Sequence, residues 1–245
     1  NGGNAFTLHS SLAAGSEIGV SNNTITGTGY LFYDETGTTE VDITYTGNDV
    51  PDTINTTEGI KGTDVKENSS SVSVAVHPVA TINGKGYATL AAAVDAANDD
   101  DTIKLVKDVN NGDGVIVPSN KKFTLDFDNH TYTVTQNLAG STGTESQCFQ
   151  LLKDSTLTFK NGTIKANNGN VAMIIQNYSN LTLENMLLDG ASITRNDATI
   201  YTMSNNCGNV EIKDTKINTV PNGVAFDVYG GFGNYSDVTV TVTGS

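Results

Sequence analysis

The feature that most constrains the fold is a short pattern that recurs along the second half of the chain. Two apolar residues stand two positions apart, and an Asn or Asp follows two positions after the second. The pattern reads LDFDN at residues 125–129, LTFKN at 157–161, LTLEN at 181–185 and VEIKD at 210–214, with a last, incomplete copy at 238–242 (VTVTV). A further apolar residue lies seven positions after the first, as Tyr132, Ile164, Leu188 and Ile217. The intervals fall within the roughly 20–50 residues typical of solenoid repeats.

Each copy is also preceded by an apolar run, so each repeat supplies about three short strands. These runs lie at residues 149–152 (FQLL), 172–175 (AMII), 199–203 (TIYTM) and 224–228 (VAFDV). A strand that pairs with its equivalent in the next repeat runs parallel to it. The repeat therefore predicts that residues 79–245 form a right-handed parallel β-helix, with an incomplete last coil.

Residues 1–78 show no trace of the repeat. Apolar and polar residues alternate at 24–26, 30–33, 41–45 and 72–76, which predicts half-buried antiparallel strands. Turn-forming residues separate these runs, including the polar stretch 52–71. We expect a small β-sandwich that ends at Pro78, so the predicted fold class is all-β.

One helix is predicted, over residues 87–97. Thr89 suits the N-cap position, because its hydroxyl can accept a hydrogen bond from a free N–H of the first turn. The apolar residues Leu90, Ala93, Val94 and Ala97 would form one buried stripe. Asn98 suits a left-handed stop. Since an open solenoid end exposes core and unpaired backbone, we expect this helix to cap the first coil.

Composition limits the partners. The 245 residues carry a net charge of −14, which disfavours nucleic acid. No apolar run approaches the ~20 residues needed to cross a bilayer, so membrane insertion is not expected. Without an initiator Met or a signal peptide, the chain is interpreted as a mature or excised fragment. Cys148 and Cys207 occupy different offsets, ~10 Å apart along a stack, beyond the ~7 Å that a disulfide tolerates. They are predicted to be buried free thiols.

Three segments carry a resemblance to a known family. They are residues 80–94 (ATINGKGYATLAAAV), 101–105 (DTIKL) and 124–131 (TLDFDNHT). With them, residues 79–245 resemble the pectate-lyase-like β-helix modules of large bacterial surface proteins, adhesins among them. The resemblance implies an extracellular location on a bacterial cell surface. It implies no single activity, because this fold hosts lyases, hydrolases, adhesins and phage spikes.

Three columns of side chains follow from the repeat. The first is interpreted as a structural ladder at a corner rather than a ligand-binding row: Asn129, Asn161, Asn185 and Asp214. The second points outward with alternating charge: Asp128, Lys160, Glu184 and Lys213. The third also points outward: Asp126, Thr158, Thr182, Glu211 and Thr239. Outward Thr columns occur on ice-binding solenoids, but acidic residues interrupt this one, which argues against ice binding.

Catalysis has few candidate residues. A polysaccharide lyase needs acidic residues that hold Ca²⁺ and an Arg or Lys that abstracts a proton. The candidates are Arg195, Asp197 and Asp189, with Asn196 beside them, in a short loop that could not wall a cleft. A glycoside hydrolase needs two carboxylates ~5–10 Å apart across a groove, and nothing evident faces Asp126 and Asp128. The three histidines, His9, His77 and His130, are scattered and suggest neither a triad nor a zinc site.

One segment could hold a metal ion. Residues 108–114 (DVNNGDG) are predicted to form a Gly-rich turn. They offer Asp108, Asn110 and Asp113 as oxygen ligands for Ca²⁺. The segment lacks the Glu at position twelve of an EF-hand loop. Calcium is the single cofactor for which the sequence offers candidate ligands.

These observations favour a non-catalytic extracellular surface module of the adhesin type. It would present a β-helix face, or the loops between copies, to carbohydrate or to a host surface protein. A lyase or glycoside hydrolase of the same fold is the first alternative. A self-assembling subunit of a surface fibre or layer, joined through the open C-terminal coil, is the second.

Overall fold

The computed structural model describes residues 79–87, 89–229 and 238–245 of the chain. Within residues 1–78 it describes Thr24 and the backbone of five strands. The chain divides into two compact units, residues 1–88 and 89–245, whereas the predicted boundary lies after Pro78. Each unit is described by itself.

The five strands described within residues 1–78 pair in parallel, which corrects the antiparallel prediction. They are β1 (Phe6–Leu8), β2 (Ser16–Ser21), β3 (Tyr30–Asp34), β4 (Val41–Thr46) and β5 (Asn55–Lys61). One sheet has the order β1-β3-β5 and the other pairs β2 with β4. Apolar alternation identifies a half-buried strand but not the direction of its neighbour. Here each sheet neighbour comes two strands later in the chain, which allows parallel pairing.

Strands β3 and β4 lie where the sequence predicts them, but β5 falls in the stretch predicted as turn. The predicted strand at 72–76 lies outside the described residues, and the β-sandwich stays a prediction. The unit ends in an antiparallel hairpin of β6 (Ala80–Ile82) and β7 (Lys85–Tyr87). Its turn residues Asn83 and Gly84 have φ of 50° and 84°, as the Asn-Gly sequence favours.

Helix α1 (Leu90–Ala96) opens the second unit. The Thr89 side chain accepts a hydrogen bond from the Ala92 N–H, so the predicted N-cap is confirmed. The predicted apolar stripe is buried, and the helix contacts β10 (Val115–Val117), the first strand of a sheet. The predicted left-handed stop at Asn98 is wrong. The helix ends in an extended Ala97, and the Lys121 ammonium donates hydrogen bonds to the carbonyls of Asp95 and Ala97.

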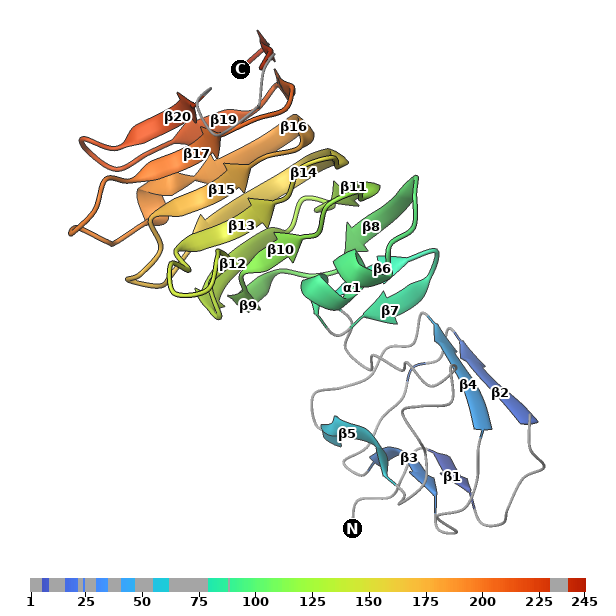
Figure 1. The fold of residues 1–245 in the computed structure, drawn as a ribbon. Coiled ribbons are helices and arrows are strands. Elements are labelled where there is room, and N and C mark those ends of the chain that lie inside the picture. The colour runs from blue at the N-terminus through green and yellow to red at the C-terminus, as the bar shows by residue number, and fades with distance from the viewer. Residues whose placement is uncertain are drawn as a thin grey trace. The chain divides into compact units, whose positions relative to one another are not determined.

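Two sheets of parallel strands make up the second unit (Figure 1). The first comprises β8 (Asp101–Leu105), β11 (Lys122–Asp126), β14 (Thr156–Ala166), β16 (Asn180–Asp189), β18 (Val210–Lys213) and β21 (Val240–Thr243). The second comprises β10, β13 (Gln147–Leu151), β15 (Met173–Asn177), β17 (Tyr201–Asn205) and β20 (Val224–Val228). Three further strands pair beside the first sheet: β9 (Val109–Asp113), β12 (Thr131–Gln136) and β19 (Lys216–Asn218). The predicted all-β class is confirmed.

Left-handed backbone at the Asn or Asp of the repeat turns each strand. In β14 the buried apolar residues are Leu157 and Phe159, and after Asn161 they are Ile164 and Ala166. Burial switches from odd to even positions because Asn161 has a φ of 58°, a conformation that Asn tolerates better than most residues. The equivalent residues share it: Asn185 at 52° and Asp214 at 45°.

The strand register corrects the alignment of the first copy. Phe123, and not Leu125, pairs with Leu157, while Tyr132 pairs with Ile164 as predicted. The first corner therefore contains two extra residues, and both Asp128 and Asn129 have positive φ there. Apolar and polar residues alternate throughout residues 123–127 (FTLDF), so this run fits the repeat in two registers. The sequence pattern therefore does not reveal the two-residue insertion.

The last copy is corrected as well. Val210 pairs with Val240, so the copy begins two residues after the predicted Val238. Gly244 then follows β21 with a φ of 66°, where the other copies have Asn or Asp. A Cβ at Gly244 would lie 2.1 Å from the Asp214 carboxylate oxygen, so glycine also provides the space this corner requires.

Aromatic side chains fill the space between the two sheets. Phe149 of β13 and Phe159 of β14 lie edge to face with ring centroids 5.7 Å apart, and Phe159 contacts Phe127 similarly at 6.1 Å. Cys148 and Cys207 are free and buried, as predicted. Burial raises the pKa of both thiols, so neither is poised as a nucleophile.

Candidate functional site

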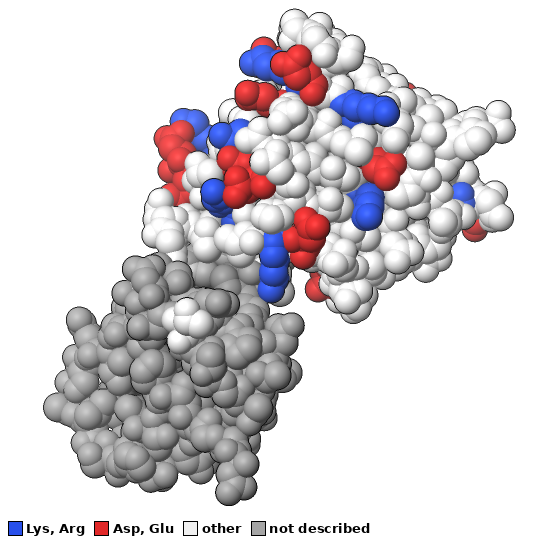
Figure 2. Space-filling view, turned by 180° about the vertical axis from the view of Figure 1, so that it is seen from behind, with Lys and Arg blue, Asp and Glu red and all other residues white. Residues whose placement is uncertain are grey.

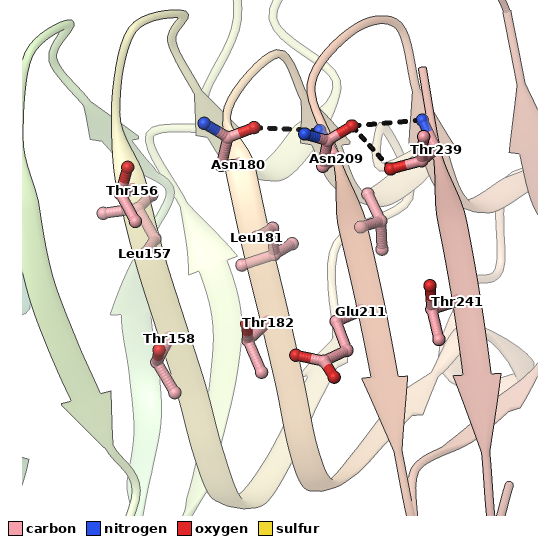
Figure 3. Close-up of a pocket in the computed structure, with 11 residues that line it drawn as sticks. Thr156, Leu157, Thr158, Asn180, Leu181, Thr182, Asn209, Glu211, Thr239 and Thr241 are labelled. Carbon is pink, nitrogen blue, oxygen red and sulfur yellow. Dashed lines mark hydrogen bonds between the residues drawn. The ribbon is translucent and has the colours of Figure 1, made fainter. Parts of the chain in front are cut away.

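A shallow hollow of about 340 Å³ lies on the outer face of β14, β16, β18 and β21 (Figure 3). Its eleven lining residues are Thr156, Leu157, Thr158, Asn180, Leu181, Thr182, Asn209, Val210, Glu211, Thr239 and Thr241. Most were not singled out as site residues by the sequence. We call the polar residues among them the polar face.

The polar face follows from the alternation of each strand combined with its register. Every second residue points into the core, which buries Leu157, Leu181 and Val210 and leaves their neighbours outside. Parallel pairing then aligns these neighbours into two columns across the strands. The first column holds Thr156, Asn180, Asn209 and Thr239, and the second holds Thr158, Thr182, Glu211 and Thr241.

The corrected register changes the composition of the second column. It continues on the other side through Thr124 and Thr102, so that Glu211 is its one acidic member over these six strands. Asp126, which was predicted in this column, lies in the neighbouring one, and Thr239 lies in the first column. The second column is therefore a more regular row of threonine hydroxyls than the sequence suggests, and we call it the hydroxyl row.

Two asparagines of the first column have fixed orientations. The Asn180 Oδ1 accepts a hydrogen bond from the Asn209 N–H at 3.0 Å. The Asn209 Oδ1 accepts from the Thr239 N–H at 3.2 Å and from its hydroxyl at 2.6 Å. Both carbonyls point toward the following strand (Figure 3). Within the described residues their Nδ2 groups have no acceptor, so they can donate to a ligand with little further ordering.

Glu211 is the single ionisable residue that lines the hollow. Its Oε2 lies 2.9 Å from the Lys213 ammonium on the same strand, which compensates the charge. The hollow is therefore close to neutral, and Glu211 adds a strong hydrogen-bond acceptor to a surface of hydroxyls and amides.

A column of alternating charge borders the polar face. The predicted column contained Asp128, but the register places Asp126 in it, in the order Lys104, Asp126, Lys160, Glu184 and Lys213. Lys160 lies 3.5 Å from Asp126, while Lys104 pairs with the corner residue Asp128 at 3.0 Å. Figure 2, seen from behind, shows blue and red side chains next to one another over the described part of the chain.

Burial alone would raise the pKa of Asp126, but its hydrogen bonds outweigh this effect. The Asp128 N–H and the Asn161 amide both donate to its Oδ1, and Lys160 is nearby. Together they hold the pKa of Asp126 below its ordinary value, so this carboxylate stays charged at neutral pH.

The residues of the predicted ladder lie at successive corners, and their contacts differ from one corner to the next. The Asn185 amide donates to the Asn161 Oδ1 at 3.2 Å, and the Asn161 amide donates to Asp126 at 3.1 Å. Asn129 and Asp214 bond the next repeat through their backbone N–H groups, to the carbonyls of Asn161 and Thr243. Their left-handed backbone accounts for Asn and Asp at these positions without a ligand.

A second amide ladder lies inside the protein and was missed by the sequence analysis. Asn177 and Asn205 are completely buried at the ends of β15 and β17. The Asn177 Nδ2 donates to the Asn205 Oδ1 at 2.7 Å and to the Ser179 carbonyl at 2.8 Å. The Ser179 hydroxyl and N–H donate back to the Asn177 Oδ1. Both residues close an apolar run at the same point of the repeat, which could have revealed the ladder.

The candidate catalytic residues are held in structural contacts. The Arg195 Nε lies 2.6 Å from the Asp197 Oδ1, and its Nη1 donates to the Asn170 carbonyl at 3.0 Å. The hydrogen bond from Arg195 lowers the pKa of Asp197. Asp189 precedes the short helix η1 (Gly190–Ser192), and no hydrogen bond or ion pair of the described residues joins it to Arg195. Arg195 thus ties together the segments that precede β15 and β17.

The candidate calcium ligands lie on or beside a strand rather than in the expected turn. Residues Val109–Asp113 form β9, which pairs with β12. The Asp108 Oδ1 accepts from the Thr131 N–H and lies 3.2 Å from the His130 Nδ1, contacts that lower its pKa. The Asp113 Oδ1 accepts from the Asn137 amide. Among the described residues, no group of three or more His, Cys, Asp or Glu side chains could hold a metal ion.

Comparison with protein-family models, with curated proteins and with solved structures finds no match to this chain. Its function is therefore inferred from its own residues. None of the helices in the described part of the chain is long and apolar enough to cross a membrane.

Proposed function

We propose that the repeat region, residues 79–245, is a right-handed parallel β-helix that serves as a non-catalytic, extracellular module on a bacterial surface. It binds a glycan or a host surface molecule through the polar face. In this proposal α1 caps the first coil and the amide ladders hold the coils in register.

The pairing of equivalent strands supports the β-helix. Strands of each sheet bond their counterparts in the next repeat, and apart from β9, β12 and β19, which pair beside the first sheet, successive strands alternate between the two sheets. The apolar residues of both sheets face a shared core that contains Phe149 and Phe159. Such a stack is rigid, which suits a surface that must hold many weak contacts in place.

The main observation that supports the proposed binding function is the polar face. Its hydroxyl, amide and carboxylate groups are outward, close to neutral, and gathered at a hollow on a regular sheet. Stability alone does not require this arrangement, because exposed Thr and Asn side chains contribute little to a fold.

The geometry of the candidate catalytic residues supports a non-catalytic role. A lyase base must reach a proton of the substrate, whereas the Arg195 guanidinium is held by Asp197 and by a backbone carbonyl. Turnover of pectate or another acidic polysaccharide by the purified protein, abolished in Arg195→Ala, would establish the lyase alternative instead.

The test is a glycan and host-protein array, run with and without Ca²⁺. We compare the wild type with Thr182→Val and with Thr102→Val. Both threonines lie in the same outward column, but Thr102 lies outside the hollow. We expect Thr182→Val to weaken the array signal and Thr102→Val to leave it unchanged. Equal signals from all three proteins would place the binding surface elsewhere.

A further inference from the structure

We infer that the polar face takes an uncharged, linear oligosaccharide whose chain lies across strands β14, β16, β18 and β21. This inference rests on the proposed binding function, and it specifies the class of ligand and its direction.

The charge of the hollow favours an uncharged ligand. Its lining contains no Lys or Arg, so a carboxylate or sulfate group would lose its hydration without meeting a cation. Glu211, the single charged residue there, is already paired with Lys213. A cationic group would have to compete with that ammonium. The net charge of −14 adds a general repulsion of anionic polymers.

The mixture of donors and acceptors favours hydroxyl groups on the ligand. Thr158, Thr182 and Thr241 have hydroxyls that can both donate and accept, and none of them bonds another described side chain. The Asn180 and Asn209 Nδ2 groups donate, and the free Glu211 oxygen accepts. A ligand that satisfies them all must itself alternate donors and acceptors at short intervals, as a sugar does.

The columns set the direction of the ligand. Across the strands the polar positions repeat every ~4.8 Å, so the hollow extends ~14 Å from β14 to β21. Along any one strand only two polar residues precede the charged column, a distance of ~7 Å. A chain molecule therefore makes more contacts when it lies across the strands, where equivalent groups recur with each repeat.

The experiment is calorimetric titration of the whole protein with cello-, xylo- and manno-oligosaccharides of two to six units, and with oligogalacturonates of the same lengths. We expect at least one neutral series to bind, with affinity that rises with ligand length up to the ~14 Å span of the face. Oligogalacturonates should bind more weakly than this series.

Variants at both ends of the face test the direction. Thr158→Val on β14 and Thr241→Val on β21 should each weaken the longest neutral ligand by about two- to tenfold, since each removes one hydrogen bond. Glu211→Gln should also weaken it, because a charge-assisted hydrogen bond becomes a neutral one. Thr102→Val is the control and should leave binding unchanged.

The outcomes separate this inference from the proposed function. Preferential binding of oligogalacturonates, or an effect of one end variant alone, would overturn the ligand class or its direction. The failure of all three neutral series would overturn the inference, while a host protein whose binding depends on Thr182 would preserve the proposed function. Neutral binding unaffected by every variant would overturn both.

Discussion

The two sheets of the second unit differ in how they use their side chains. All five residues of β13 are buried, and only Tyr201 of β17 is not. In β14 and β16, by contrast, buried and more exposed residues alternate up to the corner. A strand buried on both sides must devote every side chain to packing or to internal hydrogen bonds. We infer that β13 and β17 contribute more of their side chains to stability than β14 and β16 do, and that the alternate side chains of β14 and β16 remain available for the recognition proposed above.

The largest loss of stability is expected from a substitution in the aromatic core between the sheets. Phe149→Ala would remove a completely buried ring that lies edge to face with both Phe159 and Tyr132. Large-to-small changes of this kind cost about 3–5 kcal/mol, because a cavity remains. Urea unfolding measures the loss, and Phe149→Leu should cost clearly less. A cost below about 1 kcal/mol would contradict the assignment of stability to this sheet.

A substitution in the buried amide ladder should cause the next largest loss of stability. Asn177→Ala removes four hydrogen bonds and leaves the Asn205 Oδ1 and the Ser179 backbone without a partner in the core. Each buried unsatisfied group costs up to about 1–3 kcal/mol, and because the structure relaxes around the smaller side chain, a total of about 2–4 kcal/mol is expected. Asn180→Ala, on the exposed face, is the control and should cost less than about 1 kcal/mol. Similar losses from both variants would remove the distinction between the two sheets.

The packing of the first corner against the next repeat provides a smaller test of stability. A Cβ at Gly162 would lie 2.2 Å from the Phe127 Cβ and 2.6 Å from the His130 carbonyl oxygen. Gly162→Ala should therefore cost about 1–3 kcal/mol through overpacking. In the control, Gly169→Ala, the added methyl meets no atom within 4 Å. Thermal unfolding of the two variants compares them directly, and equal midpoints would show that this corner accommodates a side chain.

The same corner shows how far the sequence could predict this structure. The repeat identified the strands, the parallel pairing, the Asn and Asp positions and the column from Tyr132 to Ile217. It could not detect the two-residue insertion, because a run that alternates continuously fits two registers equally well. That error displaced Asp126 from the charged column and concealed the regularity of the hydroxyl row. Register depends on hydrogen bonds between strands, which a single sequence does not contain.

The sequence predicted four residues of the polar face as an outward column (Thr158, Thr182, Glu211 and Thr239), but it missed the hollow and the buried ladder for a related reason. Thr and Asn at outward positions satisfy a strand pattern without indicating a site, and only the alignment of four strands produces the hollow. Asn177 ends an apolar run, where a polar residue normally marks the surface. Tertiary partners, Asn205 and Ser179, make its burial possible.

A pH-dependent effect of modest size on stability is expected at Asp126, in the charged column beside the polar face. Its pKa is lower in the folded protein, so its contribution to stability is complete above the unfolded pKa, near 4. The contribution is lost as the pH falls through the folded pKa. Asp126→Asn should reduce stability by about 1 kcal/mol or less at pH 7, and the difference from the wild type should shrink below about pH 4. Urea midpoints at pH 3 and pH 7 measure this, and a difference that grows on acidification would contradict it.

The smallest effect on stability is expected on the polar face. Thr182→Val keeps the shape and β-propensity of the side chain, and its hydroxyl bonds no other described residue, so unfolding should change by less than about 0.5 kcal/mol. Glycan binding should nevertheless weaken, which separates recognition from folding within one residue. Thermal unfolding and calorimetric titration of the same preparation make this comparison. A loss of stability as large as that of Asn177→Ala would mean that both sheets serve the fold alike, and the polar face would then need no ligand to explain it.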